Sequence, residues 1–186
     1  MQTITLKDGG KIPVLGFGTW QLKGNDILSA LPRALEVGYR HVDTAEIYGN
    51  QKEIGKVLEK CGIPREELFI TSKVWWPRAS HDETLASCDE TLRDLRTDYV
   101  DLLLIHWSNK DVPQKETLGA LKELKDAGKT KAIGVSNYTI HRLEDALETG
   151  IPFSINQVEF HPSLNQKELL AFCKEHGAET VQGIEP

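Results

Sequence analysis

Four polar residues end short apolar runs at nearly regular intervals along the chain. Asp43, Lys73, His106 and Ser136 are 30, 33 and 30 residues apart, and a helix-like stretch follows each run. About 30 residues is the length of one strand–helix unit, and the exits of parallel strands meet at one rim of a barrel. The spacing therefore predicts an α/β barrel with a single site at the C-terminal ends of its strands.

A hairpin is expected in front of these units. A glycine-rich turn separates the alternating residues 3–6 from residues 11–15, and Pro13 argues against a central strand. We expect this hairpin to cover one end of the barrel, ahead of a first strand near residues 15–18. Six strand–helix units follow, which predicts one domain, residues 1–186, with an incomplete (β/α)8 TIM-barrel fold.

Capping patterns and apolar periodicity predict where several helices begin. A Ser or Asn three residues before a Glu is typical of a capping box. The chain has three such pairs: Asn50 with Glu53, Ser80 with Glu83, and Asn165 with Glu168. In the first helix Pro32 fits best in the first turn, which predicts a start near Ser29.

Composition and charge exclude several function classes. The 186 residues carry a formal charge of -6, with 28 acidic against 22 basic residues, whereas a nucleic-acid binder needs clustered Lys and Arg. No apolar stretch approaches the length of a membrane span, and the N-terminus has no signal-like segment. Three widely separated cysteines predict neither a disulfide framework nor a metal site, so we expect a cytoplasmic protein.

Asp43, Tyr48, Lys73 and His106 form a coherent set if the second, third and fourth strands are neighbours. A phenol has an ordinary pKa of about 10 and transfers protons poorly near neutral pH unless its phenolate is stabilised. Lys73 can supply that positive field, and Asp43 can keep a buried lysine charged. A neutral His106 can orient a carbonyl oxygen toward the phenol through a ring N–H.

Structural interpretations compete with this chemistry. Taken singly, the four residues are also compatible with a strand-end cap, a packing aromatic, a surface lysine and a core histidine. An open doubly wound sheet is the rival fold, but its dinucleotide loop needs a third glycine where Gly16-Phe17-Gly18 is followed by Gln21.

Several motifs, in the same order along the chain, resemble the aldo-keto reductases, and among them the bacterial branch that includes the 2,5-diketogluconate reductases. They occupy residues 16–20, 38–45, 48–50, 71–75, 98–102, 106–107, 134–138 and 156–159. The resemblance implies a (β/α)8 barrel that binds NADPH without a Rossmann fold and reduces an aldehyde or ketone, a small-molecule carbonyl substrate.

The resemblance also implies a role for each site residue. Tyr48 becomes the general acid, with Lys73 and Asp43 tuning it and His106 orienting the substrate. The implied coenzyme-binding residues are Thr19, Asp43, Ser136, Asn137 and Gln157. The implied substrate pocket is lined by Trp20, Trp75, His106 and Trp107.

The family pattern weakens after Gly177. Residues 178–186 form an atypical tail with few apolar residues, which predicts that the seventh and eighth strands are missing. An open barrel leaves two unpaired strand edges, through which self-association is expected. The alternative to an active NADPH-dependent reductase is therefore a catalytically impaired relative that acts as an interaction protein. An isomerase or lyase on the same barrel is a third hypothesis.

Overall fold

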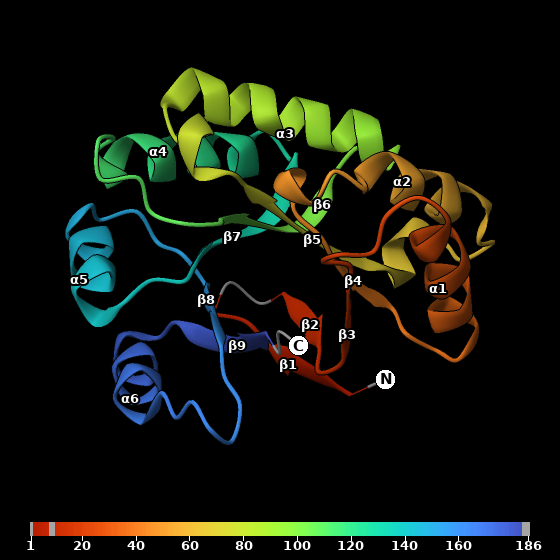
Figure 1. The fold of residues 1–186 in the computed structure, drawn as a ribbon. Coiled ribbons are helices and arrows are strands. Elements are labelled where there is room, and N and C mark those ends of the chain that lie inside the picture. The colour runs from red at the N-terminus through yellow and green to blue at the C-terminus, as the bar shows by residue number, and fades with distance from the viewer. Residues whose placement is uncertain (1, 8–9, 184–186) are drawn as a thin grey trace.

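A parallel sheet wrapped by helices forms the body of the molecule (Figure 1). The computed structural model describes residues 2–7 and 10–183. The sheet runs in sequence order from β3 to β9, and every neighbouring pair is parallel. Its strands are β3 (Gly16–Gly18), β4 (His41–Asp43), β5 (Phe69–Val74), β6 (Val100–Ile105), β7 (Thr130–Ser136), β8 (Ile155–Glu159) and β9 (Glu179–Gly183).

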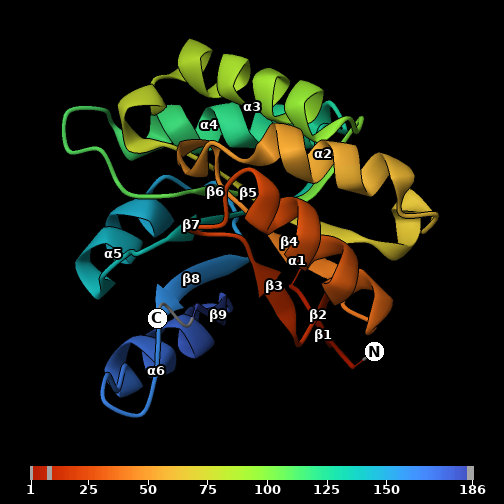
Figure 2. The ribbon, with the colours of Figure 1, turned by 45° about the vertical axis from the view of Figure 1, so that its right-hand side comes forward.

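One helix follows each of the first six strands and packs on the outside of the curved sheet (Figures 1 and 2). The helices are α1 (Asn25–Glu36), α2 (Gln51–Lys60), α3 (His81–Leu95), α4 (Gln114–Asp126), α5 (Ile140–Glu148) and α6 (Lys167–His176). This order confirms the six strand–helix units of a partial TIM barrel.

The leading hairpin closes the end of the barrel where the strands begin. Its strands β1 (Thr3–Thr5) and β2 (Lys11–Pro13) pair antiparallel beside the sheet. Leu6 and Ile12 are buried in one apolar cluster with Phe69 and Ile155, the first residues of β5 and β8. The predicted lid is thus confirmed, and it leaves the opposite, C-terminal rim open for a site.

The main core lies between the sheet and the helices. Every residue of β5 and β6 is buried, as expected for parallel strands covered on both faces. On α4, Leu118, Leu121 and Leu124 recur at intervals of three and face this core. The rigid sheet fixes the strand ends, and therefore fixes the side chains that project from them.

Two helix predictions were right in position but wrong in mechanism. Asn50 and Ser80 are the N-cap residues of α2 and α3, yet neither side chain caps its helix. The Asn50 amide instead donates to the carbonyl oxygens of Thr19 and Leu22, 2.8 Å away in each case. At Asn50, tertiary contacts therefore replace the local capping box.

Two other helix starts differ from their predicted positions. The α6 helix has Gln166 as its N-cap, one residue after Asn165. The α1 helix begins at Asn25, so that Pro32 lies in its interior and not in its first turn. The completely buried Ile27 and Leu31 lie on the core face of α1, and burial of this face outweighs the hydrogen bond that the proline lacks.

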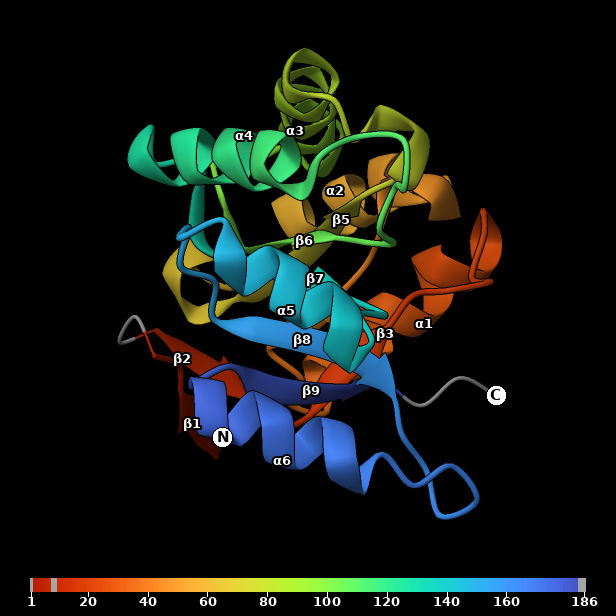
Figure 3. The ribbon, with the colours of Figure 1, turned by 90° about the vertical axis from the view of Figure 1, so that its left-hand side faces the viewer.

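The prediction that the seventh strand is missing was wrong. Residues Glu179–Gly183 form β9, which pairs with all five residues of β8 in parallel register (Figure 3). Parallel pairing is a main-chain interaction, so the open edge of β8 can order a segment whose sequence is only weakly apolar. The last three residues of the predicted tail, 184–186, lie outside the described residues. None of the described helices is long and apolar enough to span a membrane.

Candidate active site

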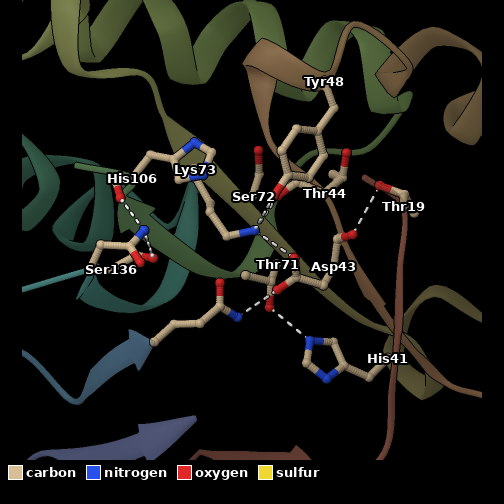
Figure 4. A network of polar contacts seen from close by, with 12 residues as sticks. Thr19, His41, Asp43, Thr44, Tyr48, Thr71, Ser72, Lys73, His106 and Ser136 are labelled. Carbon is tan, nitrogen blue, oxygen red and sulfur yellow. Dashed lines mark hydrogen bonds and ion pairs between the residues drawn. The ribbon is translucent and has the colours of Figure 1, made fainter. Parts of the chain in front are cut away.

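Adjacent strands bring the predicted polar residues to the C-terminal rim of the sheet (Figure 4). Asp43 ends β4, Lys73 is the next-to-last residue of β5, and Ser136 ends β7. His106 directly follows β6. Tyr48 is the last residue of the short helix η1 (Glu46–Tyr48), which follows β4 and holds the phenol over the same rim.

The ammonium of Lys73 is the centre of the polar network. Its Nζ lies 2.5 Å from Asp43 Oδ1 and 3.4 Å from the Tyr48 hydroxyl, and donates to the Thr44 carbonyl at 3.1 Å. The second oxygen of Asp43 accepts a 2.8 Å hydrogen bond from Gln157 Nε2 on β8. A continuous chain of contacts thus runs from Gln157 through Asp43 and Lys73 to the phenol.

The Asp43–Lys73 pair is held in its charged form. Burial favours the neutral form of each group, but the opposite charge of its partner and the hydrogen bonds that each group makes together outweigh burial. The pKa of Asp43 is consequently below, and that of Lys73 above, its ordinary value. Lys73 therefore presents a full positive charge to the Tyr48 oxygen, although its side chain is only 2% exposed.

His106 is neutral at physiological pH. Burial, and then the nearby charge of Lys73, lowers its pKa to about 4. Its ring lies edge-on to Tyr48, with 5.7 Å between the centroids, and its buried Nδ1 has no hydrogen-bond partner among the described residues. A neutral imidazole has one N–H donor and one acceptor nitrogen, so His106 can donate a hydrogen bond to a carbonyl oxygen without carrying a positive charge.

The predicted aromatic wall is partly assembled. Trp75 lies edge-on to His106 with 5.3 Å between ring centroids, whereas Trp20 and Trp107 are nearly half exposed. Trp107 lines a cavity of about 850 Å³ that also reaches Asn137. Sequence reasoning missed Trp76, which packs against Trp75 and is itself exposed; its adjacency to Trp75 was the available signal.

Ser136, Asn137 and Gln157 come together between the ends of β7 and β8. Both amide hydrogens of Asn137 are engaged, one by the His106 carbonyl and one by Ser136 Oγ, each at 3.1 Å. Asn137 adopts a left-handed backbone conformation, φ 60°, and its own N–H donates to the Gln157 carbonyl. This leaves the amide oxygen of Asn137 and the Ser136 hydroxyl proton available to a ligand.

Thr19 is placed differently from the other predicted coenzyme residues. It is completely buried, and both its hydroxyl and its backbone N–H donate to the Asp43 carbonyl at 3.0 Å. In the structure Thr19 thus holds the end of β4 in place. Sequence reasoning also missed Gln51, whose amide donates to the buried Ser72 hydroxyl, because a polar residue after Asn50 carries no local signal of burial.

The comparisons with known proteins agree with this geometry. Residues 14–186 match the model of the aldo/keto reductase family. The chain belongs to the aldo/keto reductase family. Among the described residues no group of three or more His, Cys, Asp or Glu side chains could hold a metal ion.

This aldo/keto reductase chain is similar in sequence to several bacterial reductases. It is 45% identical to the glyoxal reductase of Bacillus subtilis (strain 168) over 94% of its length, and 43% identical to a methylglyoxal reductase of Escherichia coli O157:H7 over 89%. The chain spans 64% of the length of each of these relatives.

Solved structures give the same result. The crystal structure of a putative 2,5-diketo-D-gluconic acid reductase B is 47% identical in sequence and superposes with a TM-score of 0.91. The match covers 95% of this chain and 63% of the reductase chain. An aldo/keto reductase from Brucella melitensis is 42% identical and has a TM-score of 0.94. That match covers 98% of this chain and 72% of the Brucella chain.

Proposed function

We propose that this aldo/keto reductase chain reduces small aldehydes or ketones to alcohols with NADPH, and that Tyr48 donates a proton to the carbonyl oxygen. The observation that carries the proposal is the contact between the Tyr48 hydroxyl and a charged, buried Lys73 that is itself paired with Asp43. A cation at this position stabilises the phenolate that remains after proton donation.

The residues between β7 and β8 fit the carboxamide of a nicotinamide ring. A carboxamide offers two N–H donors and one acceptor. Both amide hydrogens of Asn137 are already engaged, so its side-chain oxygen is the group that can accept a hydrogen bond from the carboxamide nitrogen. The Ser136 hydroxyl can donate to the carboxamide oxygen. Gln157 lies beside them, oriented by its hydrogen bond to Asp43. The chemistry that NADPH supplies when bound is hydride transfer to the carbonyl carbon.

The side chains of the rim then divide the remaining work. Neutral His106 donates a ring N–H to the substrate oxygen and orients it toward the phenol. Tyr48 gives its proton to that oxygen as negative charge develops there, and Lys73 stabilises the phenolate. A proton from solvent then restores Tyr48, so each carbonyl takes up one hydride and one proton.

The proposed substrates are small dicarbonyl compounds such as glyoxal or methylglyoxal. Two relatives bear the names of glyoxal and methylglyoxal reductases. The Trp75 ring beside His106, with Trp76 packed against it, offers a flat surface on which a compact carbonyl compound can pack. We further propose a cytoplasmic location, which the free thiols of Cys61, Cys88 and Cys173 support because a reducing compartment keeps cysteines unpaired.

The test is the fall in NADPH absorbance when the purified chain is mixed with methylglyoxal. Saturable turnover, with the alcohol recovered in equal amount to the NADPH consumed, supports the proposal. A cleanly folded chain that binds NADPH but forms no alcohol from methylglyoxal, glyoxal or a simple aldehyde contradicts it.

A second candidate function is association through the sheet edges. Within the described residues β3 and β9 each have a strand neighbour on one side only. Exposed strand edges are templates for pairing with another chain. Light scattering across a concentration series tests this candidate: growth of dimers or larger species supports it, and a monodisperse monomer with a sharp melt contradicts it.

A further inference from the structure

One arginine joins the turn that carries Tyr48 to the aromatic wall of the pocket. Arg78 is the last residue of the short helix η3 (Trp76–Arg78), which follows β5 and begins directly after Trp75. Its Nη1 lies 3.6 Å from Oε1 of Glu46, the first residue of the helix that Tyr48 ends. The two residues are 32 positions apart, so this contact exists only in the folded barrel.

Both carboxylate oxygens of Glu46 are engaged. Oε1 faces Arg78, and Oε2 accepts a short hydrogen bond from the hydroxyl of Ser87 on α3. Ser87 is only 1% exposed, and the Glu46 side chain is 18% exposed. An ion pair this sheltered from water is screened less than a surface pair and holds its geometry better.

The guanidinium of Arg78 is itself fixed to α3. Its Nε donates to Glu83 at 3.0 Å and its Nη1 to Glu90 at 2.7 Å. Its carbonyl accepts a hydrogen bond from Thr84, at the start of the same helix. Without Arg78, the carboxylates of Glu46, Glu83 and Glu90 would lose the cation that they share and would repel one another.

The other end of the Tyr48 turn is anchored independently. Gly49 ends the short helix with φ 66°, and the Asn50 side chain then binds the carbonyls of Thr19 and Leu22. Tyr48 thus lies between two fixed points, one formed by Asn50 and the other by Glu46 with Arg78.

We propose that Arg78 is a positioning residue that, through Glu46, holds the Tyr48 phenol at its contacts with Lys73 and His106. The inference rests on the proposed function, because it assigns the arginine to the same proton transfer. It predicts that loss of the Arg78–Glu46 contact slows the reaction and leaves coenzyme binding unchanged, since Ser136 and Gln157 lie on β7 and β8 and Asn137 directly follows β7.

The kinetic test compares Arg78→Ala, Glu46→Gln and the double variant in the full chain. Each single change is expected to lower kcat about tenfold to a hundredfold, which is typical of a small misplacement of a reacting group, with KM and NADPH affinity within about twofold. The double variant should lose no more than either single one. Arg78→Lys should recover part of the loss, because it restores the charge.

The matched control is Arg93→Ala, which removes an exposed arginine of α3 that pairs with Asp94. It should leave kcat and the melting temperature unchanged. Unchanged kcat in folded Arg78→Ala, or a loss of kcat that follows loss of NADPH affinity or of melting temperature, would overturn the proposal. If Arg78→Ala does not fold, Glu46→Gln decides, because it keeps the shape of the side chain.

A second readout does not depend on turnover. The chain has four tyrosines, so NMR with ¹³C-labelled tyrosine rings can resolve Tyr48 by comparison with Tyr48→Phe. Arg78→Ala and Glu46→Gln should move the Tyr48 signal and leave the other three in place; an unmoved signal overturns the inference. If the unmodified chain shows no turnover, the proposed function fails and this signal alone decides the role of Arg78.

Discussion

Asp43 and Asp101 are two carboxylates of the same sheet that face basic side chains at opposite ends of the strands. At the N-terminal end, Asp101 accepts from Arg65 at 2.8 Å, from Lys131 at 2.9 Å and from the Ile70 N–H at 3.0 Å. Both cations also lie over the Tyr99 ring, with Arg65 at 4.0 Å and Lys131 at 4.2 Å from its centroid. At the C-terminal rim, the Asp43–Lys73 pair lies beside the Tyr48 hydroxyl, and Nδ1 of the neighbouring His106 has no hydrogen-bond partner within the part of the chain that the structure describes.

The difference shows how similar charges serve two purposes. Around Asp101 both carboxylate oxygens accept hydrogen bonds from protein groups, and both cations are paired with the same carboxylate, which is the arrangement of a structural network. Around Asp43 the network ends at the Tyr48 hydroxyl, next to His106, which is where the proposed function places the proton transfer. The following changes separate the two roles.

The largest effect is expected from Tyr48→Phe. Because this change removes only the acidic oxygen, kcat should fall about a hundredfold to ten-thousandfold, while NADPH affinity and the melting temperature stay close to those of the unmodified chain. Steady-state rates with methylglyoxal and a fluorescence titration with NADPH measure the two quantities. Retained turnover would refute the role of Tyr48 as the acid.

The second-largest effect, on stability, is expected from Asp101 at the N-terminal end of the sheet. Asp101→Ala leaves Arg65 and Lys131 without the carboxylate that they share and should lower the free energy of unfolding by about 3 kcal/mol. Denaturant melts measure this loss. At a temperature where the variant is folded, its kcat should match that of the unmodified chain, and a selective loss of kcat would contradict a purely structural role.

Acid should destabilise the rim through His106. The folded protein keeps this ring neutral down to its pKa of about 4, whereas the unfolded chain takes up a proton below about pH 6.5. The contribution of His106 to stability is therefore present above pH 6.5 and is lost as pH falls, by about 2 kcal/mol between pH 7 and pH 5. Denaturant melts of the unmodified chain and of His106→Gln at both pH values measure it; an equal pH dependence in the two proteins would contradict the assignment.

The smallest effect is expected from an exposed pair. Lys122 and Asp126 interact across one turn of α4 with more than half of each side chain exposed. Lys122→Ala should change the free energy of unfolding by no more than about 0.5 kcal/mol and should not affect turnover. Denaturant melts of both variants show whether the larger loss of unfolding free energy in Asp101→Ala depends on the burial of Asp101.

The C-terminal rim was predictable from the sequence because it follows from local rules. Asp43, Lys73, His106 and Ser136 end apolar runs at the spacing of strand–helix units, and parallel strands then have to bring those ends together. The neutral state of His106 was also a reasonable expectation, since the same burial that encloses the site lowers its pKa.

The remaining features depend on tertiary packing. The pairing of Glu46 with Arg78 requires the position of α3, which no local pattern specifies. Asn50 has the sequence of a helix cap, yet its amide binds carbonyls of residues about 30 positions earlier in the chain. The β9 strand forms because β8 offers a free edge, although the amino-acid sequence of 179–183 gave little indication of a strand.

The central claim, that the rim around Tyr48 reduces carbonyl compounds, is tested most directly by following the transferred hydrogen. The chain is incubated with methylglyoxal and NADPH that carries deuterium at both C4 positions of the nicotinamide, and the product is examined by mass spectrometry. The account predicts an alcohol with deuterium on its new carbinol carbon, formed by the unmodified chain and by Asp101→Ala but not by Tyr48→Phe. Absence of deuterium from the alcohol, or equal labelled product from Tyr48→Phe, would contradict it.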